Sequence, residues 1–135
     1  MFLRELGVTV DEAFLTYNLA PLRLRRDIAV LGMLHRIQLG EAHEDFSKLL
    51  EPDHRVRTIT ARHDARRHQR QFREVWGRTD YFNRSIFSAV RVCNVLPADT
   101  VEAKTVKMFQ SVLTKQARIA CDAMQASWDR MYCVH

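Results

Sequence analysis

Arginine is concentrated in one stretch of this 135-residue chain, residues 54–73. The stretch holds seven arginines and one acidic residue, Asp64, so its formal charge is +6, whereas the whole chain carries +5. The rest of the chain therefore sums to −1 (+5 less +6). Because the basic charge belongs to one segment, it indicates a local binding surface and not a generally basic protein. The seven residues are Arg55, Arg57, Arg62, Arg66, Arg67, Arg70 and Arg73.

The chemistry suited to such a cluster is the binding of phosphate groups. Arginine presents a planar fork of N–H donors that matches phosphate oxygens, and clustered positive charge releases counterions from a nucleic-acid backbone. Trp76, followed by Tyr81 and Phe82, can provide stacking surfaces. We therefore predict non-specific binding of RNA or DNA through the seven arginines and Trp76. The alternative is a solvated charged surface without a ligand, with the aromatic residues in the core.

The local structure of the basic stretch decides how it presents its charge. Val56 and Ile59 are its only strongly apolar residues before Phe72, so it has little to bury. We expect a loop or a solvated helix, with residues 62–73 the more helical part. A helix there would carry a stripe of arginines able to follow the phosphates of one strand. At spacings of 4, 4 and 3, the stripe consists of Arg62, Arg66, Arg70 and Arg73.

No residue pattern in the sequence indicates catalysis or metal binding. His63 and His68 are five residues apart with His54 nearby, which is not a metal-ligand spacing, and no CxxC pair occurs. The sequence has no paired aspartates of the kind that hold two metals, and no glycine-rich phosphate loop or serine-nucleophile motif. His35 and Cys93 are expected to be buried and unreactive. We therefore predict no enzyme activity, no metal and no cofactor.

Helices are the elements expected to position these residues. Only 4 glycines and 3 prolines occur, too few for the frequent turns of an all-β fold. Thr9, Pro21 and Gly40 supply helix start and stop signals. We predict one all-α domain over residues 1–135, a small bundle of five to six helices connected in part by the basic stretch. The expected helices cover about residues 10–19, 21–39, 42–51 and 85–96, followed by a long C-terminal helix from 105 to 131.

The core is expected where the two longest apolar helices meet. Each has an apolar face that the other must cover, so we predict that Leu31, Leu34, Leu96 and Phe109 are buried together. The C-terminal helix repeats apolar residues at spacings of 3 and 4 along its whole length. These residues are Val106, Phe109, Leu113, Ala117, Ala120, Met124, Trp128 and Met131.

Neither a membrane span nor a secretion signal is visible in the sequence. The longest apolar run, residues 28–34, is far shorter than the ~20 residues that cross a bilayer. The first residues lack the apolar region of a signal peptide. Cys93, Cys121 and Cys133 are odd in number and far apart, so reduced thiols are expected. We expect a cytoplasmic or nuclear protein that is not secreted. No pattern indicates its oligomeric state.

Three short motifs follow one another along about residues 19–113. Residues 20–36, APLRLRRDIAVLGMLHR, contain an L-x-x-R-R pattern on a helix that stops at Gly40. Residues 91–97, RVCNVLP, end in N-x-L-P, and residues 106–113, VKMFQSVL, contain F-[KQ]-x-x-L. In this order the motifs resemble the extreme C-terminal region of reverse transcriptases from non-LTR (LINE-type) retrotransposons.

The resemblance implies an accessory module without a polymerase. The family has Trp before its N-x-L-P segment, where this chain has Cys93. The family's [FY]-x-D-D turn, which binds two metals, has no counterpart in this sequence, and neither have endonuclease or RNase H carboxylates. The expectation is a non-catalytic all-α tail that binds RNA or DNA. The alternatives are an inactive retroelement remnant, a protein-interaction module using the C-terminal helix and, last, an enzyme of another type.

Overall fold

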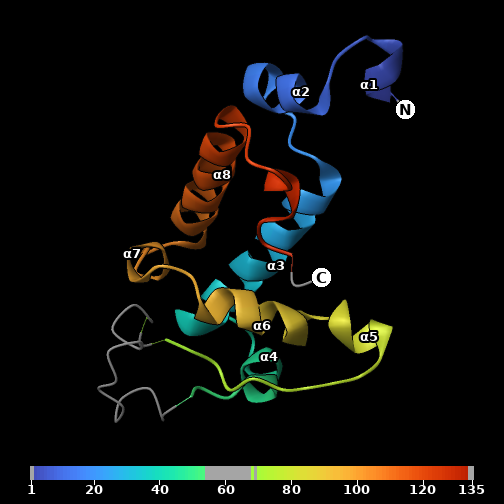
Figure 1. Cartoon of the computed structure of the whole chain (residues 1–135). Helices are drawn as coiled ribbons and strands as arrows, with labels where there is room; N and C mark the ends of the chain where they lie inside the picture. Colours follow the sequence, from blue (N-terminus) through green and yellow to red (C-terminus); the bar gives the residue numbers. More distant parts are fainter. Residues whose placement is uncertain (1, 54–67, 69, 134–135) are drawn as a thin grey trace.

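The chain is helical throughout the part that the structure describes. The computed structural model describes residues 2–53, 68 and 70–133 (Figure 1). These ranges contain eight α-helices and one 3₁₀-helix, and their only β-type pairing is an isolated antiparallel bridge between Pro52 and Phe72. The predicted all-α class is confirmed. Within the same ranges, no helix has the length and apolar character needed to cross a bilayer.

The predicted number of five to six helices is wrong, because three of the helices are single turns. α1 (Phe2–Glu5), α5 (Asp80–Asn83) and α7 (Ala98–Val101) have four residues each. A segment of this length is too short to show an apolar repeat in the sequence. α5 is nonetheless defined by a local signal, since the Thr79 hydroxyl accepts the Phe82 N–H at 3.1 Å.

The other short helices lie inside the predicted segments. They are α2 (Val10–Tyr17), α4 (Glu44–Leu49) and α6 (Ile86–Asn94), each shorter than expected. α2 begins as its sequence indicates, because the Thr9 hydroxyl accepts the Glu12 N–H at 3.2 Å. These elements frame the two long helices that carry most of the core.

α3 (Leu22–Gln38) is the centre of the fold and packs against both α6 and α8 (Val106–Asp122) (Figure 1). Pro21 is its N-cap, one position before the first helical residue. Gly40 ends it with φ +74°, a left-handed conformation that glycine adopts without a side-chain clash. The predicted start and stop of this helix are therefore confirmed to within one residue.

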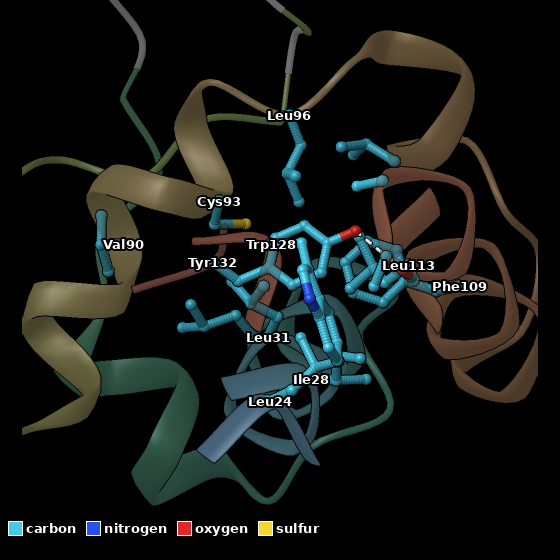
Figure 2. Close-up of a cluster of buried hydrophobic side chains, with 14 of the residues drawn as sticks. Leu24, Ile28, Leu31, Val90, Cys93, Leu96, Phe109, Leu113, Trp128 and Tyr132 are labelled. Carbon is cyan, nitrogen blue, oxygen red and sulfur yellow. Dashed lines mark hydrogen bonds between the residues drawn. The ribbon is translucent and has the colours of Figure 1, made fainter. Parts of the chain in front are cut away.

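The hydrophobic core fills the space between α3, α6 and α8 (Figure 2). Leu31, Leu34, Leu96 and Phe109 all belong to it, and none is more than 6% exposed. The prediction that these four residues are buried together is confirmed. Further core residues from the three helices are Leu24, Ile28, Val90, Cys93, Leu113 and Ala117.

The C-terminal helix ends earlier than its apolar repeat predicts. α8 stops at Asp122, and Met124 takes a left-handed conformation with φ +55°. The Gln125 N–H then donates to the Ala120 carbonyl at 3.1 Å, which is the hydrogen bond of a terminated helix. The prediction of one helix to residue 131 is therefore wrong. The chain reverses after Met124 instead.

The reversed C-terminal segment completes the core. It contains the 3₁₀-helix η3 (Trp128–Arg130), which contacts both α3 and α8. The Trp128 ring stacks on Phe14 at a centroid distance of 5.2 Å, and its Nε1 donates to Asp11 Oδ1 at 3.1 Å. The Tyr132 hydroxyl donates to the Leu113 carbonyl at 2.8 Å (Figure 2). Burial of these two aromatic side chains favours the reversal over a continued helix.

Candidate nucleic-acid interface

Three of the eight residues predicted to bind nucleic acid lie in the described part of the chain. Arg70, Arg73 and Trp76 are all exposed there. The other five predicted residues lie outside the described residues; they are Arg55, Arg57, Arg62, Arg66 and Arg67. The geometry of the candidate site is therefore given by the two flanks of the basic stretch and by the helices that hold them.

The two flanks of the basic stretch lie side by side. The preceding flank is residues 51–53, and the returning flank is residues 68 and 70–73, the C-terminal end of the stretch itself. Residues 51–53 and 71–73 are joined by two backbone hydrogen bonds around the antiparallel bridge. Both bonds are 2.8 Å long and run from the Asp53 N–H to the Gln71 carbonyl and from the Arg73 N–H to the Glu51 carbonyl. The described residues on the two sides of residues 54–67 therefore lie next to each other.

Residues 70–73 are paired with the preceding flank and are not helical. Of the two structures expected for the stretch, a loop or a solvated helix, the helix does not extend over residues 70–73. Arg70 and Arg73 therefore do not lie on a common helical stripe. The physical reason is Phe72, which is 3% exposed and packs in the core. A single large apolar residue together with strand-like pairing decides the local conformation here.

Asn94, the last residue of α6, attaches the returning flank to the core. Its Oδ1 accepts the Phe72 N–H at 2.9 Å, and its Nδ2 donates to the Phe72 carbonyl at 2.8 Å. The Gln71 side chain donates from Nε2 to the Asn94 carbonyl at 3.2 Å. Phe72 can therefore be buried with both of its backbone polar groups satisfied.

His68 makes a second attachment to α6. Its Nε2 donates to the Cys93 carbonyl at 2.7 Å, and its Nδ1 accepts the Arg70 N–H at 3.1 Å. This pair of bonds requires the neutral ring with its proton on Nε2. Burial lowers the pKa of His68, the bond to the Cys93 carbonyl opposes this, and the Arg70 charge adds to the lowering. Gln38 of α3 also holds this flank, donating from Nε2 to the Arg70 carbonyl at 2.7 Å.

The attachment through His68 is expected to weaken in mild acid. Because folding lowers the pKa of His68 from 6.5, the neutral ring stabilises the fold above that pH, and the contribution is lost as the pH falls below it. The free energy of unfolding should fall more between about pH 7.5 and about pH 5.5 in the wild type than in His68→Gln, whose amide does not titrate. Urea denaturation at both pH values measures this. An equal loss in the two proteins would contradict it.

The arginines of the returning flank point away from the core that holds their neighbours. His68, Gln71 and Phe72 are buried, whereas Arg70 and Arg73 are exposed. Arg73 Nη1 lies 3.4 Å from Glu51 Oε2, and both side chains are mostly solvated, so this pair contributes little energy and can exchange for a phosphate. The flank therefore offers two guanidinium groups from a backbone fixed by hydrogen bonds.

Trp76 is the most distinctive exposed side chain near this flank. It is 71% exposed, and the guanidinium carbon of Arg91 lies 3.8 Å from the centroid of its ring. Arg91 comes from α6, so the cation–π contact fixes the indole relative to the core. Sequence reasoning missed Arg91, because no local spacing connects it with Trp76. Only the return of the chain past α6 brings the two together.

The other two aromatic residues suggested for stacking differ from each other. Tyr81 is 88% exposed at the start of α5. Phe82 is half-buried and stacks on Phe87 of α6 at a centroid distance of 5.7 Å. A Cβ at Gly77 would clash with the Phe82 ring, so glycine at position 77 allows the chain to pass close to it. Phe82 is thus a packing residue.

The residues considered for catalysis are placed as buried side chains. Cys93 is fully buried, and burial raises the pKa of its thiol to about 12, only partly opposed by a hydrogen bond from Gln38. His35 is fully buried and stacks on Phe109 at 4.2 Å, with its Nε2 donating to the Ala103 carbonyl at 2.8 Å. Their predicted burial is confirmed. No group of three or more His, Cys, Asp or Glu side chains among the described residues could hold a metal ion.

Comparison of the chain with protein-family models, with curated proteins and with solved structures gives no match in any of the three searches.

Proposed function

We propose that this protein binds the phosphate backbone of RNA or DNA without sequence preference, through the arginines of residues 54–73, and stacks an unpaired base on Trp76. The observation that supports this most directly is the attachment of the returning flank. The Phe72 backbone and the Gln71 amide are hydrogen-bonded to Asn94 of α6, and Arg70 and Arg73 are exposed a few residues before the exposed Trp76. The resemblance to retrotransposon reverse transcriptases agrees with this function but is not needed for it, and the origin it implies stays a prediction.

The positive charge of the stretch does little to stabilise the fold through the described Arg73–Glu51 ion pair, because both side chains are mostly solvated. Like charges repel one another, so seven arginines with one acid destabilise a compact chain unless an anion neutralises them. The flanks nevertheless bring both ends of the stretch to one place on the core. Because both ends of the stretch are attached to the core, the stretch has less conformational freedom to lose when it binds a polyanion. The entropy cost of binding is therefore smaller than for an unattached basic segment.

The Trp76–Arg91 pair supplies a stacking surface for a base, which arginines that bind only phosphates do not provide. Arg91 covers one face of the indole, and the large exposed fraction of Trp76 leaves surface for a nucleobase. Stacking of a base on an aromatic ring contributes about 1–3 kcal/mol and does not depend on which base is present. The pair therefore favours single-stranded nucleic acid, whose bases are open to stacking, over a closed duplex.

Replacing Trp76 with alanine is expected to weaken binding of a mixed-sequence single-stranded oligonucleotide about tenfold, because one base loses its stacking partner. Fluorescence anisotropy of a labelled oligonucleotide at low salt measures the dissociation constant. Ile119→Ala is the control, since Ile119 is also an exposed large apolar residue but belongs to α8 and has no aromatic ring. It should change the constant by less than about twofold. Equal constants for Trp76→Ala and the wild type would contradict the stacking role.

A further inference from the structure

The structure has a cleft that is lined by none of the residues of the flanks of the basic stretch. A cleft of about 920 Å³ opens between α3, the α5–α6 region and the C-terminal segment. A cleft of this volume is in the range that holds a small organic ligand. Its polar wall residues include Arg23, Arg26, Asn83, Arg84, Ser85 and Ser88.

Three arginines from two parts of the chain border this cleft. Arg23 and Arg26 belong to α3, and Arg84 is the C-cap residue of α5, two positions before the start of α6. All three are exposed, and none forms a salt bridge with a carboxylate of the described chain. Because α3 and α6 pack directly against each other, the two sides of the cleft are held at a fixed separation. Guanidinium groups on the two sides of one cleft are suited to a phosphate, which accepts several charge-assisted hydrogen bonds.

The remaining wall residues indicate that the ligand is more than a bare anion. Asp80 also borders the cleft, and its carboxylate can accept hydrogen bonds from hydroxyl groups. Ala29, Val30 and Ala89 give an apolar surface between the charged groups. Asp27 is a second wall carboxylate, so the three arginines leave the cleft with a formal charge of +1. A strongly charged polyanion fits this balance poorly, whereas a hydroxylated phosphate monoester fits it well.

Ser85 and Ser88 add polar groups on the α6 side. The Ser85 hydroxyl donates to the Phe82 carbonyl at 2.6 Å, and the Ser88 hydroxyl donates to the Ser85 carbonyl at 2.8 Å. Both hydroxyl protons are therefore used within the protein, which leaves oxygen lone pairs directed to other donors. These two side chains act as acceptors at the wall, and the arginines remain its donors for phosphate oxygens.

We propose that this cleft is a binding site for a small phosphate monoester that carries hydroxyl groups, such as a sugar phosphate or a mononucleotide. The arginines bind the phosphate, and Asp80 binds hydroxyl groups. The site is separate from the nucleic-acid interface and does not depend on it. Its residues lie on α3, on and around α5 and α6, and in the C-terminal segment, and none belongs to residues 54–73.

Calorimetric titration with ribose 5-phosphate and with adenosine 5′-monophosphate tests the proposal, with ribose and inorganic phosphate as partial probes. We expect saturable binding of both esters, with dissociation constants at least tenfold lower than those of ribose or inorganic phosphate. Arg26→Gln and Arg84→Gln should each weaken it about tenfold or more. Arg25→Gln is the matched control, because Arg25 is the exposed neighbour of Arg26 on the same helix and does not border the cleft.

Several results would overturn the proposal. Absence of saturable heat with both esters excludes the site, and so does an Arg25→Gln effect as large as that of Arg26→Gln. Inorganic phosphate binding as tightly as ribose 5-phosphate would exclude recognition of the hydroxyl groups. The helical circular-dichroism signal of each variant shows whether it is folded. Because the substitutions are at exposed positions, that signal should equal that of the wild type.

Discussion

The Phe109→Ala variant is expected to lose about 3–5 kcal/mol of its free energy of unfolding. Phe109 is fully buried between α8 and α3, and its ring stacks on His35 at 4.2 Å. Truncation leaves a cavity at the contact of the two longest helices and also removes the surface that orients His35. His35 in turn bonds the Ala103 carbonyl at 2.8 Å, so the turn before α8 should loosen as well. Urea denaturation followed by circular dichroism measures the change.

Met108→Ala is the matched control for this prediction. Met108 is the preceding residue on α8, and its side chain is 54% exposed. Its truncation should change the free energy of unfolding by less than about 0.5 kcal/mol. A loss below about 1 kcal/mol for Phe109→Ala would show that α8 does not pack on α3 as described.

The long helices could be predicted because their sequences repeat the same apolar pattern over several turns. α3 also has Pro21 and Gly40 at its ends, and its bounds follow from these local signals. A single helical turn is too short to show an apolar repeat, so α5 and α7 could not be predicted from the sequence. Where an apolar repeat continues beyond the end of a helix, it predicts a helix that is too long. The spacing of Trp128 continues that of α8, yet Trp128 reaches the core after a chain reversal.

The residue types of the candidate site could be predicted from the sequence, but their arrangement in space could not. The arginine cluster is visible in the sequence because it needs only counting. Its attachment depends on contacts between distant residues, such as Asn94 with the backbone of Phe72. The same is true of Arg91 and Trp76, which are paired only through the fold. Long-range contacts of single residues leave no periodic trace in one sequence. The sequence therefore left a loop and a solvated helix open for a stretch whose last residues are paired with residues 51–53.

Removing three arginines together is expected to weaken nucleic-acid binding by about a hundredfold or more at low salt, equally for all sequences. The variant is Arg66→Gln, Arg70→Gln and Arg73→Gln. Each lost phosphate contact should reduce the slope of log affinity against log salt by about one unit. Arg70 and Arg73 are exposed in the described structure, and Arg66 lies outside the described residues. The helical circular-dichroism signal should stay unchanged, because Arg70 and Arg73 are exposed and belong to no described helix.

A variant with the same change in net charge separates contact from charge alone. Arg4→Gln, Arg25→Gln and Arg36→Gln together remove three exposed arginines outside residues 54–73. This control should keep the salt slope of the wild type to within about one unit. Its affinity should fall far less than that of the first triple variant, since long-range attraction is largely screened at a distance of about 10 Å in 0.1 M salt.

The salt dependence of nucleic-acid binding tests the central claim most directly. Dissociation constants for one mixed-sequence oligonucleotide are measured by fluorescence anisotropy between about 50 and 200 mM salt, for the wild type and both triple variants. The proposed interface predicts a wild-type affinity loss of about a thousandfold or more over this range, and a slope about three units shallower in the variant at Arg66, Arg70 and Arg73 alone. An equal slope in all three proteins would contradict the account, because the arginine stretch would then be a solvated surface and not a binding site.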